Sequence, residues 1–153
     1  MRMIRQPKDI KLRMNPGTFY VWVGGSCDYN SSNRESAGAY IIENVDGIVD
    51  TFVAADSGTT EFRMILTVMI RAMEFLPEHS DIVFVTNVSY IQQNFDKMPT
   101  EKSANSDLIG RCIEIKQKHN NVSVKIVPFH KFHQLPETHE MAHGAMKNQR
   151  LKK

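Results

Sequence analysis

Residues 38–76 read GAYIIENVDGIVDTFVAADSGTTEFRMILTVMIRAMEFL, and within this stretch the spacing of apolar residues changes from that of strands to that of a helix. Residues 38–43 and 48–55 are rich in β-branched and aromatic side chains, and Asp46-Gly47 between them is a strong hairpin signal. Further along, apolar side chains recur at helical spacing: Phe62, Ile65, Leu66, Met69, Ile70, Met73 and Leu76. The stretch therefore predicts an antiparallel hairpin followed by an amphipathic helix.

Three further segments have the composition of strands. Residues 18–23 (TFYVWV) and 81–86 (DIVFVT) are continuous apolar runs, which are typical of strands buried on both faces. Residues 122–127 (VSVKIV) predict the last strand. We expect Gly24-Gly25 to end the first strand, because glycine weakens a strand interior.

Helices are expected between and after these strands. Pro77 should end the long helix, which Ser57, Thr59 or Thr60 would cap at its start. Shorter helices are expected at residues 89–95 and from residue 105 or 106 onward. A loop at residues 128–136 and a final helix at residues 137–148 complete the pattern.

The order of elements is βββαβααβα. A right-handed crossover through the long helix would bring the fourth strand back beside the first. We therefore predict an α/β fold with a mixed five-stranded sheet, made of three antiparallel strands and two parallel additions, with helices on both faces.

The composition is that of a globular protein of one domain. The chain has 153 residues, of which 41% are hydrophobic and 24% charged, and a formal net charge of +2. We expect a basic lead-in at residues 1–17, the folded domain at residues 18–148 and a basic tail at residues 149–153. Cys27 and Cys112 are interpreted as reduced thiols, and no stretch resembles a membrane span or a secretory signal, so a cytoplasmic protein is expected.

Five short motifs, in order along the chain, resemble those of type 1 ribonucleases H. They are residues 23–27 (VGGSC), 59–66 (TTEFRMIL), 85–90 (VTNVSY), 105–108 (NSDL) and 131–133 (KFH). The corresponding family motifs are Asp-Gly-Ser-Cys, Thr-Thr-Asn-Asn-Arg-Met-Glu-Leu, Tyr-Thr-Asp-Ser-Gln-Tyr, Asn-x-Asp-Leu and Lys-Gly-His. The resemblance covers residues 18–148 and implies the ribonuclease H fold. It also implies hydrolysis of the RNA strand of RNA–DNA hybrids with two Mg²⁺ ions held by four carboxylates.

The four carboxylates that the resemblance implies are absent from this sequence. Gly24, Ile65 and Asn87 occupy the first three positions, and the fourth falls near Ala142 or His143. Mg²⁺ requires hard, anionic oxygen ligands, which none of these side chains supplies. The sequence therefore predicts a degenerate site without cleavage of the family type.

The positions that read the substrate are also changed. The family uses a pair of Asn residues to contact 2′-hydroxyl groups of the RNA, and here Glu61 and Phe62 replace them. Some of the polar residues near this helix start can have a purely structural role: a threonine can cap the helix, and an arginine can pair with an acidic residue. Four side chains are nevertheless candidate contacts to the nucleic-acid backbone: Ser26, Thr59, Thr60 and Arg63.

Histidines near the end of the chain offer an alternative. His139-Glu140-Met141-Ala142-His143 matches H-E-x-x-H, the zinc-binding pattern of a class of metalloproteases, but no further His, Asp or Glu follows it. His130 and His133 precede this motif. A displaced transition-metal site formed by Glu61, His133, His139 and His143 is thus one hypothesis. Exposed histidines without a metal are the other.

Three functions remain open from the sequence. The leading hypothesis is a non-catalytic protein that binds nucleic acid, as RNA–DNA hybrid or duplex, or a protein partner, without a cofactor. The second is an active ribonuclease H relative that uses the displaced metal site, or Mg²⁺ or Mn²⁺ if some nuclease activity remains. The third is a structural subunit of a larger assembly. No membrane partner is expected.

Overall fold

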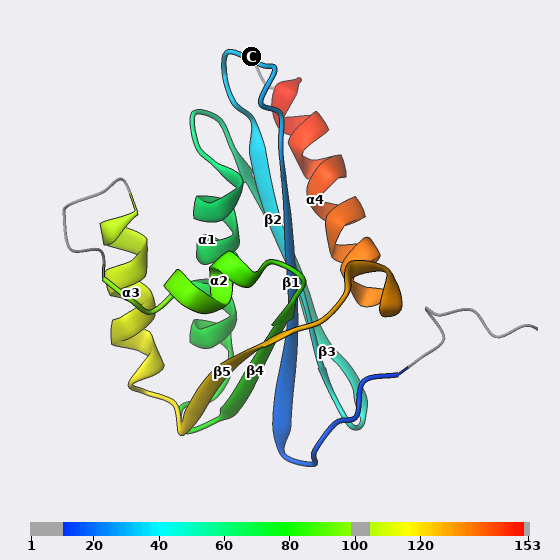
Figure 1. Ribbon diagram of the computed structural model, residues 1–153, viewed down its shortest axis with the longest axis vertical. Helices are drawn as coiled ribbons and strands as arrows, with labels where there is room; N and C mark the ends of the chain where they lie inside the picture. Colours follow the sequence, from blue (N-terminus) through cyan, green and yellow to red (C-terminus); the bar gives the residue numbers. More distant parts are fainter. Residues whose placement is uncertain (1–10, 99–104, 152–153) are drawn as a thin grey trace, which may run out of the picture.

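The computed structural model describes residues 11–98 and 105–151. Its elements are shown in Figure 1 and follow in chain order: β1 (Thr18–Cys27), β2 (Ser36–Asn44), β3 (Gly47–Asp56), α1 (Glu61–Phe75), β4 (Asp81–Thr86), α2 (Ser89–Asn94), α3 (Ser106–Lys116), β5 (Asn121–Ile126), the short 3₁₀ helix η2 (Phe129–Lys131) and α4 (Gln134–Arg150). None of the helices in the described residues has the length and apolar character needed to cross a membrane.

The five strands form one mixed sheet in the order β3-β2-β1-β4-β5. β1 pairs antiparallel with β2, and β2 with β3, whereas β1–β4 and β4–β5 are parallel. α1 and α3 lie on one side of the sheet and α4 on the other (Figure 1). The predicted fold class is confirmed.

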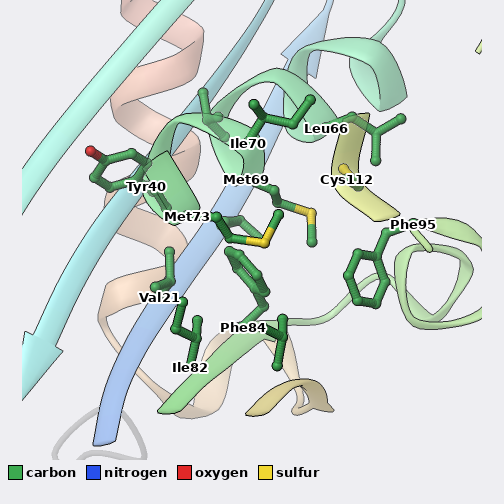
Figure 2. Packing of buried hydrophobic residues seen from close by; sticks show 14 of the residues in the cluster. Val21, Tyr40, Leu66, Met69, Ile70, Met73, Ile82, Phe84, Phe95 and Cys112 are labelled. Atoms are coloured by element: carbon green, nitrogen blue, oxygen red, sulfur yellow. The ribbon is translucent and has the colours of Figure 1, made fainter. Parts of the chain in front are cut away.

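The long helix α1 fits its sequence signals. The Thr60 hydroxyl accepts a hydrogen bond from the Arg63 backbone N–H (3.1 Å), which caps the helix at its start. Pro77 follows the helix end at Leu76. The apolar face of α1 packs onto the sheet and α3, and Figure 2 shows its Met69 and Met73 beside Phe84 of β4.

The first strand is longer than predicted. β1 continues through Gly24 and Gly25 to Cys27, and the two glycines pair with Ala39 and Gly38 of β2. Backbone pairing in the centre of the sheet thus outweighs the weak strand preference of glycine. The absence of side chains also lets the helices approach β1 closely from both faces, as described below.

The last helix starts earlier than predicted. α4 begins at Gln134 rather than at residue 137, so Pro136 lies inside its first turn. Proline is tolerated there because the first backbone N–H groups of a helix have no partner within it. The predicted loop is correspondingly shorter and includes η2.

Candidate nucleic-acid interface

A cleft lies at the edge of the sheet where β1 and β4 end. These two strands are parallel neighbours, so the residues at their carboxyl ends come together. The cleft has a volume of about 450 Å³ and is also bordered by the starts of α1 and α4. Its lining residues are Gly24, Gly25, Ser26, Cys27, Glu61, Asn87, Val88, Phe129, Leu135 and His139.

Gly24 is in close contact with α4. A Cβ atom placed on Gly24 would lie 2.7 Å from the Oγ1 atom of Thr138. Thr138 is fully buried, and its hydroxyl donates a hydrogen bond to the Leu135 carbonyl (2.9 Å). The space that a side chain at position 24 would need is therefore already filled.

The residue of α4 that contacts Gly24 is Thr138. Ala142 and His143, near which the fourth carboxylate of the family is predicted to fall, lie about one turn further along α4. Ala142 is buried in a small cluster with Ala37 and Ala39 of β2. The contact between Thr138 and Gly24 has no direct signal in the sequence, because the length of the loop before α4 leaves the register of this helix open.

Two more positions at which the family has a carboxylate, those of Ile65 and Asn87, differ in burial. Ile65 is 2% exposed and belongs to the main hydrophobic core, where an unpaired carboxylate would be costly. Asn87 is exposed and follows β4 directly, at the rim of the cleft. Among the described residues that line the cleft, Glu61 carries the only carboxylate.

The candidate phosphate contacts have partners within the protein. The Arg63 guanidinium donates two hydrogen bonds of 3.0 Å to the Asp107 carboxylate. These bonds are the main reason why the pKa of Asp107 falls to about 2. The Ser26 hydroxyl is buried and points toward Met146 Sδ (3.6 Å).

The two threonines support the start of α1. Thr60 is its cap, and the Thr59 carbonyl accepts a hydrogen bond from the Ser36 hydroxyl (3.5 Å). Both threonines are partly buried and lie before the helix. Contacts of these two residues to nucleic acid therefore remain a prediction.

Of the two histidines in α4, His139 lines the cleft and His143 stacks on it. The His139 ring has Nδ1 3.2 Å from the Gly25 carbonyl and stacks on His143, with ring centroids 6.1 Å apart. His143 Nδ1 in turn lies 3.5 Å from the Ser26 hydroxyl. His133, by contrast, pairs with Glu137 at an exposed position (2.5 Å).

The hypothesis of a displaced metal site is not supported by this arrangement. Within residues 11–98 and 105–151, no three His, Cys, Asp or Glu side chains lie together in a way that would hold a metal ion. Glu61 and His139 line the cleft, whereas His143 stacks on His139 and His133 pairs with Glu137. The H-E-x-x-H motif is thus part of an amphipathic helix beside the cleft.

A second cavity of about 250 Å³ adjoins the cleft and was not predicted. It is lined by Tyr29, Glu61, Phe62, Ile65, Val88, Tyr90 and Ile91, and it shares Glu61 and Val88 with the cleft. Its aromatic residues come from three separate segments of the chain. Their spacing in the sequence therefore gave no signal that they meet.

Comparisons with known proteins identify the fold. No model of a known protein family matches the sequence, and no curated protein matches it. Among solved structures, the chain is similar to LC9-RNase H1, a type 1 RNase H with the type 2 active-site motif. The TM-score is 0.73 at 19% identity, over 90% of this chain and 76% of that one.

Two further solved structures agree. RNase H1 from the halophilic archaeon Halobacterium salinarum NRC-1 gives a TM-score of 0.63 at 16% identity, over 84% of this chain and 98% of that one. LC11-RNase H1, solved in complex with an RNA/DNA hybrid, gives 0.63 at 14% identity, over 81% and 95%. Together with the strand order and the position of the cleft, these similarities show that the chain has the ribonuclease H fold.

Proposed function

We propose that this protein binds nucleic acid at the cleft and does not carry out metal-dependent cleavage of RNA–DNA hybrids. The observation that carries the proposal is the contact between Gly24 and Thr138. It occupies the space of a carboxylate on β1, while the cleft beside it stays open.

The side chains in the cleft do not fit a two-metal site. Such a site activates a water molecule and neutralises charge on the leaving oxygen, and it needs several anionic ligands. Gly24 and Ile65 supply no oxygen, and Asn87 supplies a neutral carbonyl at best. Glu61 alone would leave most of the charge of two divalent ions uncompensated.

Binding without cleavage is supported by the open cleft and by exposed cations outside its lining. One solved relative in fold, LC11-RNase H1, was determined in complex with an RNA/DNA hybrid. In this chain Arg34 is exposed in the loop between β1 and β2, at the same edge of the sheet as the cleft. Lys147 is exposed in the last turns of α4.

Fluorescence anisotropy with a labelled RNA–DNA hybrid and its separate strands tests the proposal. We expect binding at about 50 mM salt that weakens steeply by about 200 mM salt, because counterions are released from phosphates. Arg34→Glu should weaken binding. Lys118→Glu is the matched control, since Lys118 is exposed before the amino end of β5, at the opposite edge of the sheet.

Two results would overturn the proposal. Absence of binding to all three probes at low salt would favour a structural subunit instead. Equal loss of affinity in both charge variants would place the binding surface away from the cleft.

A further inference from the structure

The cavity beside the cleft presents aromatic rings to solvent. Tyr29 is 65% exposed and Tyr90 is 52% exposed, and both line this cavity. The Phe62 and Tyr90 rings pack edge to face, with centroids 4.9 Å apart and an interplanar angle of 70°. Phe62 thus fixes the orientation of Tyr90, while much of the Tyr90 surface stays accessible.

The second tyrosine lies in the loop after β1. The guanidinium carbon of Arg34 lies 6.0 Å from the centre of the Tyr29 ring. Burial raises the pKa of the Tyr29 phenol, and the charges of Cys27 and Glu61 contribute in the same direction. Tyr29 therefore lies near both a cation, Arg34, and a carboxylate, Glu61.

Glu61 decides what kind of group fits between the rings. Among the described residues that line the cleft and the cavity, Glu61 carries the only carboxylate and His139 the only imidazole. No Lys or Arg is among these described lining residues. A phosphate placed there would meet a negative charge without a cation. A planar group with N–H donors would instead stack on the tyrosines and donate hydrogen bonds to Glu61.

We propose that the cavity binds an unpaired base of a single-stranded nucleic acid, which lies against Tyr29 and Tyr90 and donates to Glu61. This inference rests on the proposed nucleic-acid binding and adds to it a pocket for one unpaired base beside the cleft. Guanine fits best, because its N1–H and N2–H groups form two adjacent donors for one carboxylate, whereas uracil has one donor between two acceptors. The phosphates of the strand lie outside, on the side of Arg34.

Anisotropy with short labelled oligouridines that contain G, C, A or U at the central position tests the base preference. We expect the oligomer with G to bind about 10-fold more tightly than the one with U, from the discrimination of a two-bond contact. Glu61→Gln should abolish this difference while leaving binding of the U oligomer nearly unchanged.

Stacking is tested by variants of the two tyrosines. Tyr90→Ala and Tyr29→Ala should each weaken binding of the G oligomer by about 10-fold, since stacking contributes at this level per base. Tyr90→Phe keeps the ring and should bind as the wild type does. Phe75→Ala is the matched control, because Phe75 is 48% exposed at the opposite end of α1 from Glu61.

The outcomes separate this inference from the proposed function. Binding of the hybrid together with equal affinity for all four oligomers and no effect of the tyrosine variants overturns the inference alone. Absence of binding to any nucleic acid overturns both. Tyr29→Ala keeps the test decisive if Tyr90→Ala unfolds, because Tyr29 lies in an exposed loop.

Discussion

The contact between Gly24 and Thr138 makes a quantitative prediction for Gly24→Ala. The added methyl group would lie 2.7 Å from Thr138 Oγ1, which is closer than van der Waals contact. Overpacking of this kind costs about 1–3 kcal/mol, and the reduced freedom of the unfolded chain offsets about 0.4–1 kcal/mol. We expect the free energy of unfolding to fall by about 1–2 kcal/mol.

Thr138→Ala should relieve this cost. As a single variant, Thr138→Ala loses the hydrogen bond to the Leu135 carbonyl and a buried methyl group. Together these losses should lower the free energy of unfolding by about 1–2 kcal/mol. In the double variant the nearest remaining atoms, Thr138 Cβ and His139 N, lie 3.4 and 3.6 Å from the new methyl group. We therefore expect the double variant to lose about 1–2 kcal/mol in total, instead of the sum of about 2–4 kcal/mol.

Urea unfolding of the wild type, the two single variants and the double variant can be followed by tryptophan fluorescence. Trp22 is the single tryptophan and is fully buried, with its Nε1 donating to Glu43 Oε1 (2.7 Å), so its fluorescence should report global unfolding. Midpoints and slopes then give the free energies. Additivity of the two substitutions within about 0.5 kcal/mol would refute the close contact on which the proposal rests.

Three further predictions concern the stability and reactivity of the fold. Gly38→Ala should destabilise the protein more than Gly24→Ala in the same urea assay, because its methyl group would lie 2.5 Å from a backbone carbonyl oxygen of α1, which has no rotamer to change. The pKa of Asp107 is lowered from 3.8 to about 2 by Arg63, so this carboxylate stabilises the folded state above pH 4. The stabilisation is lost as the pH falls from 4 toward 2, and the difference in urea midpoint between wild type and Asp107→Asn should shrink over that range. Burial raises the pKa of Cys112 to about 12, so iodoacetamide at pH 8 should modify Cys27 in the native protein and leave Cys112 unmodified. Mass spectrometry identifies the modified cysteine. Rapid labelling of Cys112 would contradict its burial.

The sequence predicts most of this fold because the two periods of its apolar residues are clear. The strand at residues 81–86 is predicted with its correct bounds, and the long helix is predicted on its correct face. The errors arise where tertiary contacts override local preference. Gly24 and Gly25 continue β1 because β2 pairs with them, and Pro136 is accommodated in the first turn of α4.

The candidate site is less predictable than the fold. The motifs that contain Gly24, Ile65 and Asn87 lie on elements whose order the sequence predicts correctly. Their places near the cleft could therefore be anticipated. The role of Thr138 depends on the rotation and register of α4, which a loop of ambiguous length does not determine. Tyr29 and Tyr90 are separated by four elements of the chain, and only the folded sheet brings them to one cavity.

The most direct test of the central claim is a single-turnover cleavage assay. The protein, in excess over an RNA–DNA hybrid labelled on the RNA strand, is incubated with Mg²⁺ and separately with Mn²⁺. A gel then resolves intact RNA from products. We predict that the RNA is recovered intact under conditions in which anisotropy shows the hybrid to be bound. Cleavage products that disappear in Glu61→Ala or His143→Ala would contradict this account, because they would show that the cleft itself is catalytic.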